Sequence, residues 1–174
     1  MELVFGAGPC PCKLMVIGEA PGREETKLKT PFVGKAGKFF IGILNEVFGL
    51  ERNEFYITNV VKFWPVIETK RKKTKPPTIE EVRFFTPFLK KEIKAVSPEW
   101  IIAVGKTSFC AVAPDNDFVP GKWVTGYNGI SVMPVYHPAY ILRKQRILAT
   151  NTKELKKALM KVRERLEVEV GCKN

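Results

Sequence analysis

The chain lacks the features that mark several classes of protein. It has no run of about 18 or more apolar residues, and Met1 leads almost directly into a strand-like stretch. We therefore expect neither a membrane-spanning helix nor a secretory signal, and hence a cytoplasmic protein. The four cysteines are scattered and indicate neither a disulfide framework nor a four-ligand metal site. A partial metal or redox role for Cys10 and Cys12 stays open, because a close pair supplies half of a tetrahedral shell.

Acidic residues are also in short supply. Asp and Glu together number 18 against 29 Lys and Arg, which leaves a formal charge of +11. Such an excess favours a polyanionic partner, although lysine-rich surfaces can also serve only solubility, so motifs must decide. With 174 residues, 45% of them hydrophobic, the chain can bury a core without disulfides or a structural metal. We expect one globular domain over residues 1–174.

Short apolar runs alternate with longer amphipathic stretches, a pattern typical of an α/β protein. We expect strands at 14–17, 55–61, 100–104 and 130–135, each rich in Val, Ile or aromatic residues. Strands that are apolar on both faces suit a sheet covered on both sides. Helices are expected from the periodicity at 35–48, 78–96, from about 106, and 152–168. The prediction is a central four-stranded, mainly parallel sheet between two helical layers.

Two segments interrupt this pattern. Residues 18–37 follow the first strand as a stretch rich in Gly and Pro, and long loops after the carboxyl end of a strand are where α/β proteins build sites. Residues 68–77 read Glu-Thr-Lys-Arg-Lys-Lys-Thr-Lys-Pro-Pro, which cannot pack in a core. That loop is either simply solvated or lies against phosphate.

Three motifs, the first of them in two segments, carry a family resemblance. Residues 18–22 read Gly-Glu-Ala-Pro-Gly, residues 31–37 read Pro-Phe-Val-Gly-Lys-Ala-Gly, residues 58–62 read Thr-Asn-Val-Val-Lys, and residues 137–143 read His-Pro-Ala-Tyr-Ile-Leu-Arg. In sequence, spacing and order they resemble the motifs of family 4 uracil-DNA glycosylases. The resemblance covers nearly the whole chain. It implies a three-layer α/β/α fold and a monofunctional enzyme that excises uracil from DNA, leaving an abasic site without lyase cleavage.

His137 and Asn59 have side chains that suit this chemistry. Cleavage of the glycosidic bond leaves negative charge on the departing base, and a neutral imidazole can donate a hydrogen bond to a uracil carbonyl as that charge grows. Asn59 ends an apolar strand, and its amide offers one donor and one acceptor, the complement of the carbonyl and imide edge of uracil. A structural histidine and a turn-forming asparagine are the alternatives.

The resemblance implies roles for the remaining residues of the loop. Glu19 would position a water or support the cationic sugar. Ala20 stands where faster relatives carry Asp, so the reaction would depend on stabilising the leaving group. Glu25 would help to exclude the methyl group of thymine. Gly18 is also expected to bind the substrate. Phe32 suits a platform on which a flipped base stacks, with core filling as its alternative.

Contacts with DNA are expected from glycines that allow close approach of backbone and from basic residues: Gly34, Gly37, Lys70, Arg71, Lys72, Lys73, Lys75 and Arg143. The basic loop resembles the insertion of UdgX proteins, which tether themselves covalently to DNA through a His. Here Thr74 stands in the corresponding stretch, and a hydroxyl without an adjacent base is a poor nucleophile. Turnover is expected, with a tethering or binding protein and a glycosylase for hypoxanthine or xanthine as alternatives.

One part of the family pattern is missing. Family 4 enzymes usually hold a four-iron cluster on four cysteines, and at two of those positions this chain has Phe63 and Phe85. Phenylalanine cannot ligate iron, so no cofactor and no metal ligands are expected. The expected partner is uracil-containing DNA, single- or double-stranded, bound by a monomer without any membrane association.

Overall fold

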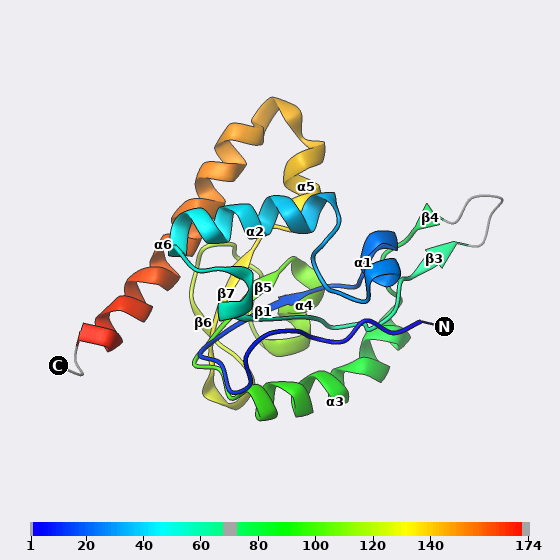
Figure 1. The fold of residues 1–174 in the computed structure, drawn as a ribbon, viewed down its shortest axis with the longest axis horizontal. Helices are drawn as coiled ribbons and strands as arrows, with labels where there is room; N and C mark the ends of the chain where they lie inside the picture. Colours follow the sequence, from blue (N-terminus) through cyan, green and yellow to red (C-terminus); the bar gives the residue numbers. More distant parts are fainter. Residues whose placement is uncertain (1, 68–72, 172–174) are drawn as a thin grey trace.

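The fold is built on one central sheet. The computed structural model describes residues 2–67 and 73–171. Four strands run parallel, β1 (Leu14–Gly18), β2 (Tyr56–Asn59), β5 (Trp100–Val104) and β7 (Ser131–Val135), and β6 (Val124–Thr125) pairs antiparallel to β7. Their order across the sheet is β2-β1-β5-β7-β6 (Figure 1). The four parallel strands point in the same direction and are aligned with one another, so their carboxyl ends lie at the same edge of the sheet.

The sheet has five strands where the sequence predicted four. The four predicted strands are all present, and the additional one, β6, contributes only two residues at the edge. A segment that short leaves no alternation of apolar and polar residues to detect. Strands β1 and β5 are buried at every position, which explains why both read as continuous apolar runs.

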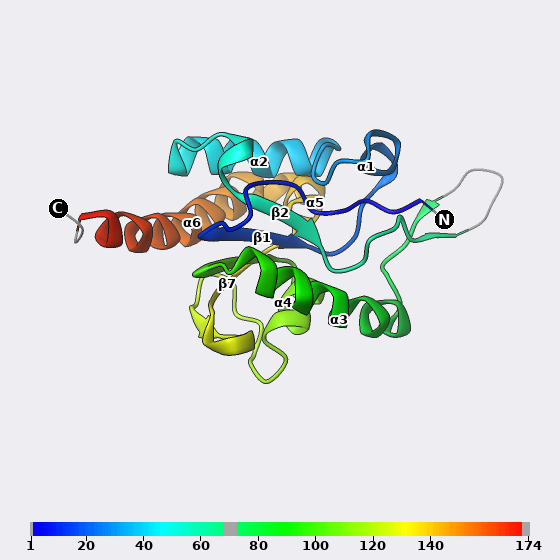
Figure 2. The ribbon, with the colours of Figure 1, turned by 60° about the horizontal axis from the view of Figure 1, so that its bottom comes forward.

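Helices cover both faces of the sheet, which confirms the three-layer α/β/α prediction (Figure 2). On one face α2 (Lys35–Phe48) and α6 (Leu148–Gly171) pack over the strands in one buried apolar cluster. On the other face α3 (Ile79–Val96) and α4 (Lys106–Val112) form a second cluster. No helix in the described part of the chain has both the length and the apolar character that crossing a membrane requires.

The predicted helix boundaries agree closely with the structure. Thr78 caps α3: its hydroxyl accepts from the backbone N–H of Glu81 at 3.2 Å, and the Glu81 carboxylate accepts from the N–H of Thr78 at 2.7 Å. Helix α6 begins at Leu148 rather than at 152, because a short 3-10 turn (Gln145–Ile147) leads directly into it.

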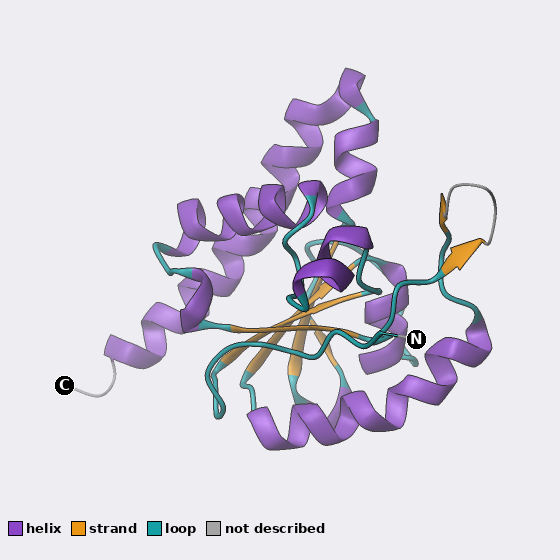
Figure 3. Cartoon of the chain, turned by 45° about the vertical axis from the view of Figure 1, so that its right-hand side comes forward, coloured by secondary structure: helices purple, strands orange, loops and turns teal. Residues whose placement is uncertain are grey.

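Smaller elements, which the sequence analysis did not predict, lie at the carboxyl edge of the sheet. Helix α1 (Arg23–Leu28) lies in the Gly- and Pro-rich stretch after β1, and α5 (Pro138–Arg143) follows β7. Strands β3 (Val66–Ile67) and β4 (Lys73–Thr74) form an antiparallel hairpin that projects from the body of the protein (Figures 1 and 3). These additions surround the edge where the predicted site residues lie.

Candidate active site

A cavity of about 260 Å³ opens at the carboxyl edge of the sheet. Strand β1 ends at Gly18, β2 ends at Asn59, and His137 follows β7. Because the strands are parallel, these three ends converge, and the loops after them form the wall. Nine of the predicted residues line the cavity: Glu19, Ala20, Glu25, Phe32, Gly34, Gly37, Asn59, Lys75 and His137. The structure thus brings these predicted residues together around one cavity.

Gly18 lies directly behind the cavity and allows its walls to converge. A Cβ at this position would lie 2.4 Å from Oδ1 of Asn59 and 2.7 Å from Cζ of the Phe32 ring. Both distances are far below van der Waals contact, so any side chain here would displace one of the two residues. Gly18 therefore has a packing role that brings Asn59 and Phe32 together.

The orientation of His137 is fixed by the start of α5. Its Nδ1 accepts a hydrogen bond from the backbone N–H of Ala139 at 3.1 Å, which assigns the proton of the neutral imidazole to Nε2. Nε2 has no hydrogen-bond partner among residues 2–67 and 73–171. Burial lowers the pKa of His137, the negative charge of Glu19 opposes that shift, and Arg143 adds to it. The imidazole is therefore held neutral, with one N–H available.

Glu19 is held by a residue that the sequence analysis did not identify. The hydroxyl of Thr107, in the first turn of α4, donates to Oε2 of Glu19 at 2.5 Å. The other carboxylate oxygen of Glu19 has no partner in the described part of the chain. Glu19 therefore lines the cavity in a fixed orientation with one free acceptor. Thr107 lies 88 residues away in the chain, so no local pattern could reveal the contact.

Asn59 has a nearly buried amide that remains unpaired within the described residues. Its side chain lines the cavity, and the residue is only 3% exposed. Among the described residues, Nδ2 of Asn151 is the side-chain polar atom that is wholly buried without a partner, so the amide of Asn59 is unpaired but open to the cavity. The Asn59 amide faces a cavity that also contains the free N–H of His137, so a bound molecule is the natural partner for both.

Phe32 adopts a backbone conformation that is unusual for a bulky residue. Its φ angle is +58°, in the left-handed region, and its ring packs 5.9 Å from that of Phe40. Two contacts hold the backbone in place. Arg52 donates to the carbonyl oxygens of Pro31 and Phe32, and Gly37 lies so close that a Cβ there would be 2.4 Å from the Phe32 carbonyl carbon. Strain of this kind persists only where the surroundings enforce it.

Glu25 holds the same loop from within the cavity. One carboxylate oxygen accepts from the N–H of Gly34 at 2.7 Å and the other from the N–H of Gly22 at 3.0 Å. The residue is 9% exposed, so this carboxylate fixes two turns of the backbone. It also occupies the Gly34 N–H at the start of α2, which is then not free for a phosphate. These contacts give Glu25, Gly34 and Gly37 structural roles beside the predicted ones.

The β3–β4 hairpin supplies a wall that the sequence did not predict. Pro65 and Thr74 line the cavity together with Lys75. The Thr74 hydroxyl accepts from Nε1 of Trp64 at 2.9 Å, and the N–H of Lys75 donates to Pro65 at 3.1 Å. The hairpin thus places a basic residue at the mouth of the cavity. Its turn signal was obscured because the connecting residues are a run of charge rather than Gly and Asn.

Not every predicted DNA contact lies beside the cavity. Lys73 and Arg143 are exposed, on β4 and in the last turn of α5, and do not line the cavity. Lys70, Arg71 and Lys72 lie outside the described residues. Lys75, which does line the cavity, makes a 3.8 Å ion pair with Glu81.

The four-iron cluster that the resemblance implies does not fit the residues present. Phe63 and Phe85 pack ring to ring at 5.8 Å, with Phe84 5.1 Å from Phe85. Among the described residues no three side chains of His, Cys, Asp or Glu converge as metal ligands. Cys10 instead donates to the carbonyl oxygen of Ala95 at 3.3 Å. These positions hold an aromatic cluster that supplies no donor atoms.

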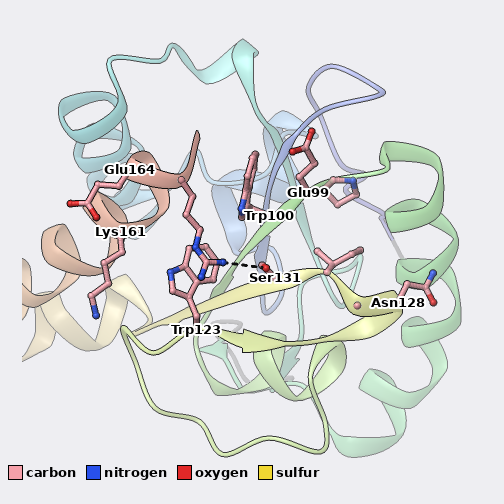
Figure 4. Close-up of a pocket in the computed structure, with 11 residues that line it drawn as sticks. Glu99, Trp100, Trp123, Asn128, Ser131, Lys161 and Glu164 are labelled. Carbon is pink, nitrogen blue, oxygen red and sulfur yellow. Dashed lines mark hydrogen bonds between the residues drawn. The ribbon is translucent and has the colours of Figure 1, made fainter. Parts of the chain in front are cut away.

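A larger hollow, of about 910 Å³, lies at the opposite edge of the sheet, where β5 and β7 begin (Figure 4). Its two basic side chains, Lys161 and Arg165, both contact neighbouring residues. Lys161 donates to the carbonyl oxygen of Gly121 at 2.7 Å. The guanidinium of Arg165 lies 4.2 Å from the centre of the Trp123 ring and donates to the Ser131 hydroxyl at 3.4 Å. The basic side chains of this hollow are therefore already engaged, whereas His137 at the smaller cavity keeps its Nε2–H without a partner among the described residues.

Comparison with known proteins agrees with this geometry. The profile of the Uracil DNA glycosylase superfamily matches residues 5–163. A Type-4 uracil-DNA glycosylase of Saccharolobus solfataricus is 34% identical over 90% of this chain and 76% of its own length. The Type-4 enzymes of Thermotoga maritima and Pyrobaculum aerophilum are 33% and 35% identical, over 83% and 87% of this chain and 73% and 79% of their own lengths. The resemblance expected from the motifs is confirmed, and the chain belongs to the uracil-DNA glycosylase superfamily.

Proposed function

We propose that this protein excises uracil from DNA by hydrolysing the N-glycosidic bond and leaves an abasic site. The observation that carries the proposal is the convergence of two unpaired polar groups on one cavity, the amide of Asn59 and the Nε2–H of His137, beside the ring of Phe32. A uracil has edges that satisfy both groups and a flat face for the ring. The relatives named as Type-4 uracil-DNA glycosylases support the same reading.

The base would have to leave the helix to reach this cavity. Asn59 would pair with the carbonyl and imide of uracil, and cytosine presents the opposite pattern at those atoms. A mismatched base would leave buried polar atoms unpaired, at a cost of about 1–3 kcal/mol for each group. Phe32 would stack on the base, which contributes ~1–3 kcal/mol. Because the Phe32 backbone is already held by Arg52 and Gly37, little ordering would accompany binding.

In the reaction the bond between C1′ of the sugar and N1 of uracil breaks, and its electron pair stays with the base. His137 would donate from Nε2 to the uracil oxygen on which negative charge accumulates. Glu19, held by Thr107, would face the cationic sugar or the attacking water with its free oxygen. The oxygen of that water forms the new bond to C1′, and a proton of the water is released as the abasic product forms.

The basic surface around the mouth of the cavity would bind the phosphates of the DNA. The formal charge of +11, with Lys75 at the cavity and Lys73 and Arg143 exposed, supports phosphate contacts. The predicted contacts of Lys70, Arg71 and Lys72 belong to the same proposal. We expect a monomer that accepts both single- and double-stranded DNA, and that acts in the cytoplasm.

We further propose that the protein works without an iron–sulfur cluster. The aromatic cluster of Phe63, Phe84 and Phe85 supports this, because apolar packing can hold the segment that follows β2 against α3. Protein purified anaerobically should lack absorbance near 400 nm and bound iron. A bound cluster that is needed for activity would overturn this part of the proposal.

The proposed activity is tested with labelled oligonucleotides that carry a single uracil, thymine or cytosine. The purified protein should produce alkali-dependent cleavage at uracil only, since a monofunctional enzyme leaves the abasic strand intact until it is treated. Cleavage without alkali would indicate lyase activity. A slow-migrating covalent adduct would indicate tethering to DNA, and an unchanged uracil oligonucleotide would overturn the proposal.

A further inference from the structure

Behind Asn59 lies a buried ion pair that the proposed reaction does not use. Nζ of Lys62 donates to Oε2 of Glu92 on α3 at 2.5 Å, to Oγ1 of Thr58 at 2.6 Å, and to the backbone carbonyl oxygen of Asn59 at 2.8 Å. The other oxygen of Glu92 accepts from the hydroxyl of Tyr56 at 2.9 Å. The three acceptors match the three N–H donors of an ammonium group.

The amino-terminal segment shields this ion pair from water. The N–H of Val4 donates to the carbonyl oxygen of Lys62 at 2.6 Å. Gly6 covers Glu92 and Tyr56 so closely that a Cβ there would lie 2.4 Å from Oε1 of the glutamate. Lys62 is 5% exposed as a result, and burial lowers its pKa while Glu92 opposes the shift. A charge so far from water is costly, so the arrangement calls for a reason.

The position of β2 in the sheet supplies that reason. Strand β2 lies at the edge, with β1 on one side and only the amino-terminal segment on the other. That segment pairs with Ile57 in β2 and again with Lys62 beyond the end of the strand. Between those two points, none of its described residues donates a backbone N–H to the carbonyl oxygen of Asn59. The ammonium of Lys62 fills this gap. It thereby fixes the backbone carbonyl of Asn59, the residue whose side chain faces the cavity.

We propose that Lys62 is a positioning residue for the amide of Asn59, an inference that rests on the proposed function. The ammonium lies on the α3 side of the strand, and the Asn59 side chain faces the cavity beside Gly18. Lys62 does not touch the base. It fixes the backbone from which Asn59 reads the base, so its loss should slow the chemical step more than it weakens binding of DNA.

A double-mutant cycle tests this inference. Lys62→Met alone would leave the carboxylate of Glu92 without its ionic partner. It is therefore combined with Glu92→Leu, so that both charges are removed and the side-chain volumes stay similar. Single-turnover release of uracil is measured for this pair with and without Asn59→Ala. We expect a loss of about 10- to 100-fold when Asn59 is present and less than about twofold when it is absent. Equal losses in both backgrounds would overturn the inference.

The exposed ion pair of Lys156 and Glu46, also 2.5 Å long, provides the matched control. Lys156→Met with Glu46→Leu should leave the rate of uracil release unchanged. If the first pair of substitutions prevents folding, Lys62→Gln with Glu92→Gln gives the same cycle, because glutamine is too short to reach the carbonyl oxygen of Asn59.

A second measurement separates the inference from the proposed function. The side-chain NH₂ signals of Asn59 in an NMR spectrum should shift or broaden when the ion pair is removed, whether or not the protein releases uracil. A wild-type protein that releases no uracil would overturn the proposed function alone. Asn59 signals that do not change on removal of the ion pair would overturn the positioning role.

Discussion

The two hollows at opposite edges of the sheet differ in size and in chemistry. The one at the amino edge measures about 910 Å³ and the one at the carboxyl edge about 260 Å³. In the larger, Arg165 stacks on Trp123 and Lys161 binds a backbone carbonyl. In the smaller, Asn59 and His137 each keep a polar group without a partner among the described residues. Unpaired groups that converge, rather than volume, distinguish the candidate active site.

The difference follows from the direction of the strands. At their carboxyl ends, parallel strands are followed by loops free to carry polar side chains, and here these loops hold Glu19, Asn59 and His137. At the amino edge β5 begins with Trp100 and β7 begins with Ser131. Helix α6 lies over this edge, and its Arg165 donates to the hydroxyl of Ser131. Variants at the two hollows test this contrast.

The largest effect is expected from His137→Ala. Loss of one hydrogen-bond donor to a developing negative charge typically costs about 10²–10³-fold in rate, and we expect a loss of this size in single-turnover release of uracil. Ser131→Ala, in the larger hollow, should change that rate by less than about twofold. Comparable losses in both variants would mean that the contrast between the two hollows is not functional.

A large effect is also expected from Gly18→Ala. Because the added methyl group would lie 2.4 Å from Oδ1 of Asn59, the amide or the ring of Phe32 must move, and release of uracil should fall by about 10- to 100-fold. Gly42→Ala is the matched control, since no atom lies within 4 Å of its Cβ and the site is an exposed position inside α2. That variant should keep full activity and gain about 1 kcal/mol in free energy of unfolding.

A smaller and more specific effect is expected in how uracil release and stability depend on pH. Because burial lowers the pKa of His137 below 6.5, the imidazole should gain its proton only at a pH below that of a free histidine, and release of uracil should stay level down to that point. Unfolded protein binds the proton first as the pH falls. The contribution of His137 to stability is therefore present above pH 6.5 and is lost as the pH falls toward the folded pKa. Melting temperatures of wild type and His137→Gln across this range would show it, and parallel curves would contradict it.

The smallest effect on activity is expected from Trp123→Ala. The substitution removes the ring on which Arg165 stacks and part of the packing beside α6, so it should lower the free energy of unfolding by about 1–3 kcal/mol. At a temperature where both proteins are folded, release of uracil should stay within about twofold of wild type. A marked loss of activity with an unchanged melting temperature would give the larger hollow a functional role.

Much of the fold and of the candidate site could be predicted because it depends on local pattern. Apolar runs located the four long strands, and the sequence placed Asn59 at the end of one of them. The contacts of Thr107, Arg52 and Lys62 could not be predicted. Each depends on a partner brought close only by tertiary packing, as with Thr107 and Glu19. Lys62 did carry one local signal, since it directly follows the apolar pair Val60 and Val61.

The left-handed backbone of Phe32 has a consequence for how the protein meets its substrate. Its φ of +58° is enforced by Arg52, Gly37 and the neighbouring turns fixed by Glu25, all within the free protein. The conformational cost is therefore met during folding, once per molecule, and is not repeated at each encounter with DNA. In the proposed function, the ring would therefore meet each extruded base as a rigid surface, and binding would need little ordering of the protein.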